Sequence, residues 1–313
     1  MSEPALSEVL ALQEDPPLRT HSRATDVIRL LRPAQWTKNV LVFVAPGAAH
    51  LLGHPAAVVR SIAIFAVFCA AASAMYCLND TIDVERDRVH PKKRHRPVAA
   101  GRISPALAIG IALLLAAGAL AGAWFVASWQ LVVVVALYAV ISLSYSLWLK
   151  HVPVLELGAV ASGFVLRAIA GGVAVHVPLS EWFLLLTSFG ALFLVIGKRT
   201  GEQATLGDTR AMHRQTLSMY TPEFLRSALT LSAAAAVTTY CLWAFDRAGL
   251  AQRGDHLVWI ELSVAPVVMG ALYVLRILMD RRGESPTELV LHDRMLQLLA
   301  LSWAALVLVG VYG

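Results

Sequence analysis

The sequence predicts an all-α polytopic membrane protein with nine transmembrane helices. Of its 313 residues, 58% are hydrophobic and 15% are charged, whereas a soluble domain carries about 25% charged residues. Long apolar runs recur along the chain, and most reach the roughly 17–25 residues that a helix needs to cross a bilayer. They lack the alternation of apolar and polar residues that is typical of barrel strands. The runs cover residues 39–52, 57–78, 104–127, 129–149, 153–177, 181–197, 224–245, 257–279 and 295–312.

The N-terminal part of the chain differs from the rest. Residues 1–25 are predicted to be a partly disordered cytoplasmic tail, because they are acidic and lack the basic start and apolar core of a signal peptide. Residues 26–313 are predicted to form a single transmembrane domain. Its opening, Asp26 to Trp36, has the spacing of an interfacial amphipathic helix, with an ordinary linker as the alternative. The first span contains Pro46 and Gly47, so we expect it to be broken or tilted.

The distribution of basic residues predicts the orientation. The chain has 26 Lys and Arg residues, and nearly all precede the first span or lie in alternate loops. Only Arg60, Arg247 and Arg253 fall on the other side of the membrane, and Arg167 lies within a span. The positive-inside rule therefore places the N-terminus in the cytoplasm and the C-terminus outside the inner membrane. No nucleic-acid partner is expected, because the basic residues occupy short loops that face membrane lipids and carry no DNA-binding motif.

Acids and bases follow one another in the predicted cytoplasmic loop 79–103. Its acids stand three or four residues apart and share one face if the second helix continues beyond the membrane. Like charges placed in this way repel unless a cation lies among them, and hard oxygen ligands suit Mg²⁺. The basic string His90-Pro-Lys-Lys-Arg-His-Arg-Pro97 comes next, with cations that can bind phosphate and stabilise a departing pyrophosphate. The alternative is a positive-inside loop whose acids are incidental.

The string NDxxDxxxD followed by HPxKxxRP, between Asn79 and Pro97, resembles the first aspartate-rich motif of the UbiA superfamily of intramembrane prenyltransferases. The nine predicted helices agree with that family, and the resemblance covers the chain from about Leu30 to its end. It implies a UbiA-type bundle with a catalytic site that faces the cytoplasm. It also implies site residues: the catalytic, Mg²⁺-binding residues Asp80, Asp83 and Asp87, with Asn79 as a further ligand, and the phosphate-binding residues Lys93 and Arg96.

The second predicted cytoplasmic loop, 198–223, departs from the family pattern. Prenyl-transferring members carry a second acidic motif there, where this chain has Lys198, Arg199 and Glu202. This departure resembles the actinobacterial branch that makes decaprenyl-phosphoryl-5-phosphoribose. The branch implies transfer of 5-phosphoribose from 5-phosphoribosyl 1-diphosphate to decaprenyl phosphate for cell-wall arabinan synthesis. The alternative is a prenyltransferase that acts on an aromatic or haem-like acceptor.

Further side chains are candidates for binding the substrates of such a reaction, which bring two more phosphates than prenyl transfer does. Lys198 and Arg199 are also compatible with headgroup anchoring, and residues at the end of the fourth span with interface marking. A charge within a span is costly unless it is paired or faces a polar cavity. The candidates are Arg32, Lys38, Asn79, Lys93, Arg96, Tyr145, Lys150, Arg167, Lys198, Arg199 and Glu202.

The sequence also bears on transport, on helix packing and on assembly. A transporter is disfavoured, because charges in transporters lie near the midplane of the bilayer and here they cluster at one membrane face. The Gly171-Gly172 pair is expected to permit close helix packing. Assembly into a homo-oligomer is left open by the sequence.

Overall fold

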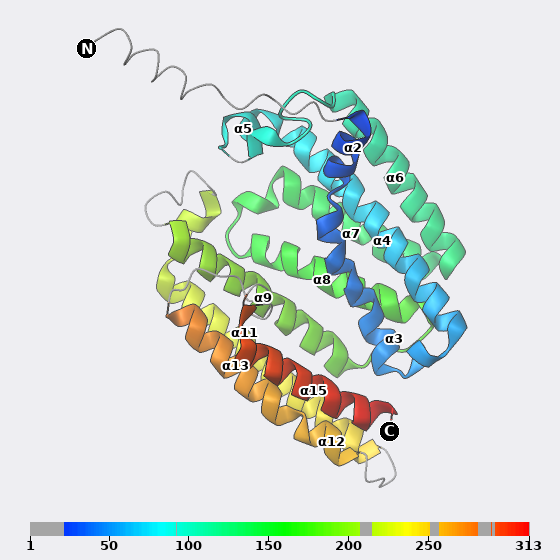
Figure 1. Ribbon diagram of the computed structural model, residues 1–313, viewed down its shortest axis with the longest axis vertical. Coiled ribbons are helices and arrows are strands. Elements are labelled where there is room, and N and C mark those ends of the chain that lie inside the picture. The colour runs from blue at the N-terminus through cyan, green and yellow to red at the C-terminus, as the bar shows by residue number, and fades with distance from the viewer. Residues whose placement is uncertain are drawn as a thin grey trace, which may run out of the picture.

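A computed structural model describes residues 22–91, 93–206, 215–250, 257–280, 289 and 292–312. Within these residues every regular element is a helix (Figure 1). Eight helical spans in the described chain are long and apolar enough to cross a membrane, which confirms the predicted all-α polytopic fold. The long helices are α4 (Pro55–Ile82), α6 (Pro105–Val126), α7 (Trp129–Leu147), α8 (Leu155–Ala174), α9 (Glu181–Leu206), α11 (Pro222–Leu250), the pair α12 (Leu257–Leu262) and α13 (Val264–Met279), and α15 (Arg294–Tyr312).

The opening segment contains a helix followed by a sharp break. Helix α2 (Arg23–Leu31) begins at Ser22, whose hydroxyl accepts the Thr25 N–H. It ends at Arg32, which has a φ of 53° because the following proline disfavours a helical residue before it. The structure therefore favours the amphipathic helix over the linker, but only as far as Leu31. Residues 1–21 of the predicted tail lie outside the described residues.

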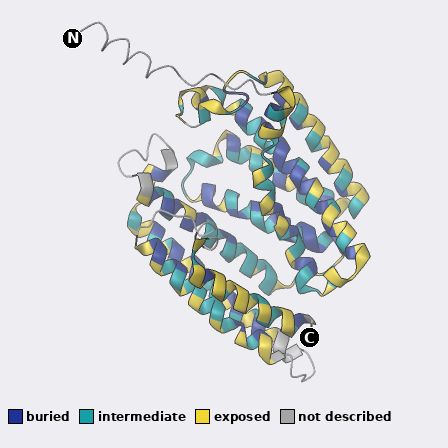
Figure 2. Cartoon of the chain, viewed as in Figure 1, coloured by how far each residue is buried: buried dark blue, intermediate teal, exposed yellow. Residues whose placement is uncertain are grey.

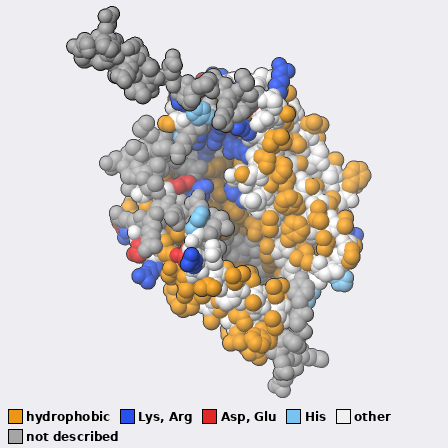
Figure 3. All heavy atoms as spheres, viewed as in Figure 1, with side chains coloured by type: hydrophobic (Ala, Val, Ile, Leu, Met, Phe, Trp, Pro, Cys, Tyr) orange, Lys and Arg blue, Asp and Glu red, His pale blue; other side chains and the backbone are white. Residues whose placement is uncertain are grey.

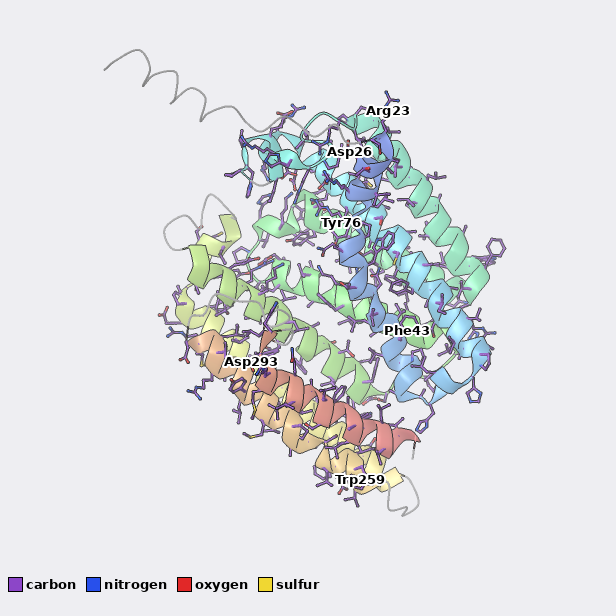
Figure 4. All side chains as sticks on the ribbon, in the orientation of Figure 1. Arg23, Asp26, Phe43, Tyr76, Trp259 and Asp293 are labelled. Carbon is purple, nitrogen blue, oxygen red and sulfur yellow. The ribbon has the colours of Figure 1, made fainter. Side chains whose placement is uncertain are left out.

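The first predicted span, 39–52, is not one regular helix. The 3₁₀ helix η1 (Pro33–Phe43) has 11 residues and is followed by α3 (Val44–Ala48), which has 5. Pro46 has no N–H to donate to Val42, so α3 cannot extend backwards as an α-helix. Because a 3₁₀ helix rises about 2.0 Å per residue, η1 and α3 together reach roughly 30 Å, the thickness of the hydrocarbon core. In Figure 4 the chain descends beside α4 from Arg23 on α2 towards Phe43 at the end of η1. With the eight long spans, η1 and α3 make a ninth candidate crossing, which is the first in chain order.

The helices form two groups that share α8. One hydrophobic cluster joins η1, α4 and α7 to α8 through buried side chains such as Phe68 and Leu131. The other joins α8 to α9, α11 and α13 through side chains such as Val195 and Leu225. Buried residues gather in the central helices, whereas the outer faces of α6 and α15 are largely exposed (Figure 2). Exposed apolar side chains such as Phe125, which is 85% exposed, suit a protein whose outer surface contacts lipid.

Close packing of α8 against the opening segment depends on glycine. A Cβ atom on Gly171 would overlap the backbone carbonyl of Val42, and one on Gly172 would clash with Leu179. The expectation that this pair serves helix packing is confirmed for Gly171, which meets η1, whereas the neighbour of Gly172 lies in the loop after α8. The close approach brings Asn39 of η1 within reach of the middle of α8, where Arg167 lies.

The ends of two helices differ from the predicted loops. Helix α4 continues to Ile82 and is followed by α5 (Val84–Val89) and the 3₁₀ turn η3 (Lys93–His95). Helix α9 continues to Leu206, so the first residues of the predicted loop 198–223 are helical. Pairing of Arg199 with Glu202, one turn later, supports this extension. Residues 207–214 of that loop lie outside the described part of the chain.

Candidate active site

The acidic end of α4 forms one side of the candidate site. Asp80 lies in the last turn of α4 and is 1% exposed. The helix ends two residues later, because Asp83 leaves the helical conformation with φ −93° and ψ 8°. Asp87 follows within α5 and is 2% exposed. The helix therefore does not carry all the acids on one continuous face, and they reach different partners.

Arginines neutralise two of these acids. The Nη1 atom of Arg96 donates to Asp87 Oδ2 at 2.5 Å and lies 3.2 Å from Asp80 Oδ1. Arg32, at the break between α2 and η1, also donates to Asp80 Oδ1 and lies over the ring of Tyr76, 4.9 Å from its centroid. The carboxylates of Asp80 and Asp87 consequently converge on one cationic nitrogen atom.

Asp83 has a separate partner. Its Oδ1 accepts a hydrogen bond from Lys150 Nζ at 2.6 Å, and Lys150 belongs to the 3₁₀ turn η4 (Leu149–His151) after α7. The adjacent His151 lies 3.3 Å from an Arg86 guanidinium nitrogen. Burial, with the charges of Arg86 and Lys150, holds the pKa of His151 below its usual value. A neutral imidazole can accept a hydrogen bond from Arg86, which suits this contact.

The donor chemistry of this end fits one Mg²⁺ ion. Within the described residues no three His, Cys, Asp or Glu side chains stand close enough together to hold a metal. Mg²⁺, however, takes one or two carboxylates and completes its shell with water and phosphate oxygens. The nitrogen of Arg96 stands where such a cation would contact Asp80 and Asp87. Asp83 instead contacts Lys150, and the nearby Asn79 side chain is half-buried.

Cations from separate segments form a second feature, which we call the basic group: Arg32, Lys38, Arg167 and Lys198. Lys38 on η1 is close enough to the other three to feel their charges. Lys38 and Lys198 are exposed, and the structure shows neither in an ion pair with a described acid. Figure 3 shows Lys and Arg side chains gathered at the upper end of a hollow whose right wall is largely hydrophobic. Exposed cations that form no ion pair with a described acid are suited to binding phosphate.

Arg167 lies deep within α8 and is held by neutral polar groups. Its Nε donates to Asn39 Oδ1 at 2.6 Å and its Nη2 to the Tyr138 hydroxyl at 3.0 Å. It also donates to the carbonyl of Gly163 and stacks over the Tyr138 ring, 4.7 Å from the centroid. This buried charge is therefore hydrogen-bonded, as a charge within a span must be. Asn39 and Tyr138 were not among the predicted site residues, although a polar amide within an apolar run is a signal for such a partner.

Lys198 and Arg199 point to different surroundings. Arg199 is 3% exposed and forms two hydrogen bonds to the fully buried Glu156, at 2.8 and 2.9 Å. A third bond, at 2.9 Å, reaches Glu202, and Tyr145 lies near enough to interact with the same guanidinium. Lys198 instead lies near enough to Lys38 for their charges to interact. Glu156 was not among the predicted site residues, although a carboxylate at the start of an apolar span is a signal for a buried partner.

The loop after α5 is tied to the N-terminal helix. Arg102 donates to the buried carboxylate of Asp26 at 2.8 Å and to the carbonyl of His95 at 2.8 Å. Lys93 begins η3, where its backbone N–H donates to His90 Nδ1 at 3.3 Å. These bonds hold the loop that carries Arg96 over the end of α4. Asp26 and Arg102 were not among the predicted site residues.

Comparisons with known proteins identify the family and the fold of the chain. A family model described as the UbiA prenyltransferase family matches residues 40–311. The decaprenyl-phosphate phosphoribosyltransferase of Mycobacterium tuberculosis is 44% identical over 286 residues, which cover 90% of this chain and 92% of that protein. The Corynebacterium glutamicum protein of the same name is 41% identical over 294 residues, covering 92% and 87%. A UbiA homologue from Archaeoglobus fulgidus, solved bound to GPP and Mg²⁺, has a TM-score of 0.67 at 20% identity and covers 91% of this chain and 98% of that one.

Proposed function

This chain belongs to the UbiA prenyltransferase family, and we propose that it transfers 5-phosphoribose from 5-phosphoribosyl 1-diphosphate to decaprenyl phosphate, releasing pyrophosphate. Two relatives that match about nine-tenths of the chain carry the name of that activity. The product is a precursor suited to cell-wall arabinan synthesis. The observation that carries the proposal is the basic group beside the acidic end of α4.

Two anion-binding regions lie side by side in this arrangement, and Arg32 belongs to both. It donates to Asp80 at the acidic end and is one of the cations near Lys38. The acidic end with Arg96 suits the diphosphate of the donor. Lys38 and Lys198 suit the additional phosphates, which are the 5-phosphate of the donor and the phosphate of the acceptor lipid. A prenyl donor with an aromatic acceptor brings no such phosphates, so the basic group favours phosphoribosyl transfer.

The reaction exchanges one C–O bond for another at the anomeric carbon of ribose. An oxygen of the lipid phosphate forms the new bond to C1, while the bond from C1 to the diphosphate oxygen breaks and its electron pair leaves with pyrophosphate. The lipid phosphate is already ionised, so no protein base is needed. Arg32 and Arg96 are placed to move from carboxylates to phosphate oxygens and to stabilise the charge on the leaving group.

A divalent metal is implied by the family, and the convergent carboxylates of Asp80 and Asp87 would hold it, with Asp83 and Asn79 as further candidates. When bound, Mg²⁺ would neutralise the diphosphate and so improve it as a leaving group. Lys150 bears on this assignment, because Asp83 can turn towards a metal only by giving up its 2.6 Å contact with that lysine. Tyr145 and Glu202 are proposed to act through Arg199, which both of them approach.

Purified protein, labelled phosphoribosyl diphosphate and decaprenyl phosphate test the proposal directly. We expect Mg²⁺-dependent transfer of label into the organic phase, and no prenyl transfer to aromatic acids. A parallel reaction with a labelled prenyl diphosphate and an aromatic acid serves as the control. A wild-type protein that consumes the prenyl diphosphate and ignores phosphoribosyl diphosphate would instead be a prenyltransferase, and the basic group would then contact headgroups.

We also propose that the site faces the cytoplasm. In Figure 1, α2 and α5 lie towards one end of the molecule and the end of α15 towards the other, as expected for an odd number of crossings. A reporter active only outside the cytoplasm should be active when fused after Gly313 and inactive when inserted within residues 207–214. The reverse pattern would place the site on the outer face.

A further inference from the structure

The turn between η4 and α8 has an unusual backbone. Val154 has φ 67° and ψ −50°, a region that residues with a side chain rarely adopt and that is strained for a β-branched one. The N–H of Leu155 donates to the carbonyl of Pro153 at 2.8 Å, so these residues form a γ-turn of the strained, positive-φ kind. Val154 is 55% exposed, so packing of its own side chain does not hold the turn. Such backbone persists only where its surroundings hold it.

Tyr220 supplies a contact that holds this turn. The N–H of Val154 donates to the phenolic oxygen of Tyr220 at 2.7 Å. The Tyr220 ring is stacked on Phe224, with centroids 5.5 Å apart and an interplanar angle of 5°. Its backbone carbonyl accepts a hydrogen bond from Gln203 at 2.8 Å. Helices α9 and α11 thus place the hydroxyl, and the hydroxyl meets the backbone of the turn.

The turn lies between two ion pairs of the candidate site. Before it stands Lys150, which contacts Asp83 at 2.6 Å. After it stands Glu156, which holds Arg199 next to Lys198. A change in the φ and ψ angles of Val154 would redirect the chain on both sides and shift both pairs. One hydrogen bond is therefore placed to influence the acidic end of α4 and the basic segment of α9 together.

We propose that Tyr220 is a positioning residue for donor binding, whose hydroxyl holds the γ-turn at Val154 and so aligns Lys150 with Asp83 and Glu156 with Arg199. The inference rests on the proposed function, because it takes these pairs to border the diphosphate site. Nothing in the reaction requires Tyr220 to touch a substrate. Its contribution is to keep a strained turn in the geometry that both ion pairs need.

Replacing Tyr220 with phenylalanine tests the inference, because the ring and its stacking on Phe224 remain and only the hydroxyl is lost. We expect the KM for phosphoribosyl diphosphate to rise about fivefold to tenfold, the effect of one lost hydrogen bond. The kcat and the KM for decaprenyl phosphate should change little. A Tyr220→Phe protein with the wild-type donor KM would overturn the inference.

Tyr240→Phe is a matched control for general loss of a buried hydroxyl. Tyr240 is 4% exposed and Tyr220 is 5% exposed. The Tyr240 hydroxyl contacts Ser263 at 2.5 Å and Trp303 at 2.8 Å, and it lies roughly 27 Å along α11 from Pro222 at the rise of an α-helix. Its loss should leave the donor KM unchanged. An equal rise in both variants would show a general structural effect and contradict a positioning role.

A second substitution, at Val154, tests whether the Tyr220 hydroxyl acts by holding the turn and not in some other way. Glycine adopts positive φ readily, so Val154→Gly removes the strain that the hydroxyl opposes. In the Tyr220→Phe background, Val154→Gly should return the donor KM to near the wild-type value. A double variant as impaired as Tyr220→Phe alone would contradict the proposal.

Inorganic pyrophosphate with Mg²⁺ separates this inference from the proposed function, because its binding needs no transfer. Ligands that bind the folded state raise the unfolding temperature. Tyr220→Phe should reduce the rise in unfolding temperature that Mg²⁺-pyrophosphate produces. Adding Val154→Gly to Tyr220→Phe should restore that rise. If that pattern holds while the wild type ignores phosphoribosyl diphosphate, only the proposed function fails. If the wild type transfers phosphoribose, and Mg²⁺-pyrophosphate raises the unfolding temperature equally in the wild type and all variants, only the inference fails.

Discussion

Replacing Asp80 with asparagine is expected to lower the rate of phosphoribosyl transfer by at least about a hundredfold. Asp80 and Asp87 converge on a single cationic nitrogen, and asparagine keeps the shape of Asp80 while removing the charge that a metal needs. The unfolding temperature should change much less, because Arg96 still pairs with Asp87 and Arg32 still lies over the Tyr76 ring. The measurements are turnover over a range of Mg²⁺ concentrations and the unfolding temperature in detergent.

Asp26→Asn provides a matched control for that result. Asp26 is 3% exposed and is paired with Arg102 at 2.8 Å, so it is another buried acid with an arginine partner. Among the described residues it contacts none of those proposed to bind substrate. It acts through Arg102 and the loop, so its loss should reduce stability and lower turnover per folded molecule far less than Asp80→Asn does. Near wild-type turnover by Asp80→Asn at low Mg²⁺ would remove Asp80 from the metal ligands. Equal losses of turnover in both variants would point to folding as the cause.

The adjacent cations Lys198 and Arg199 are expected to respond in opposite ways to alanine. Arg199→Ala leaves the fully buried Glu156 without its main cation, and breaking a buried pair in this way costs about 3–5 kcal/mol of folding free energy. Lys198→Ala removes an exposed cation that forms no ion pair with a described acid, and it should leave stability nearly unchanged. It should instead raise the KM for phosphoribosyl diphosphate about tenfold, the effect of one charge-assisted hydrogen bond, with little change in the Mg²⁺ requirement.

Chemical unfolding in detergent and donor titrations measure the two effects separately. Adding Glu156→Gln to Arg199→Ala should restore much of the stability, because the buried negative charge that Arg199 had balanced is then removed. If Lys198→Ala and Arg199→Ala lower stability equally, the buried pair of Arg199 with Glu156 is not a special source of stability. If Lys198→Ala leaves the donor KM unchanged, Lys198 is not a phosphate ligand.

Local properties of the sequence were sufficient for the broad architecture. The length and composition of the apolar runs predicted the long helices, because crossing a bilayer sets a minimum length for each helix by itself. Pro46 and Gly47 marked the irregular first crossing. The spacing of Asp80 and Asp87 and the basic string after them indicated the acidic end of the site, since those residues are close in sequence.

The tertiary structure decided which charges meet. Arg199 pairs with Glu156, and Arg167 with Asn39, across segments that are far apart in the chain. The sequence alone treated Lys198 and Arg199 as one pair of phosphate ligands, but they are separated because successive residues on a helix face different directions. The γ-turn at Val154 and its contact with Tyr220 were also invisible in the sequence. Neighbouring residues determine whether a segment can be helical, but the partner of a buried charge depends on how non-consecutive helices pack.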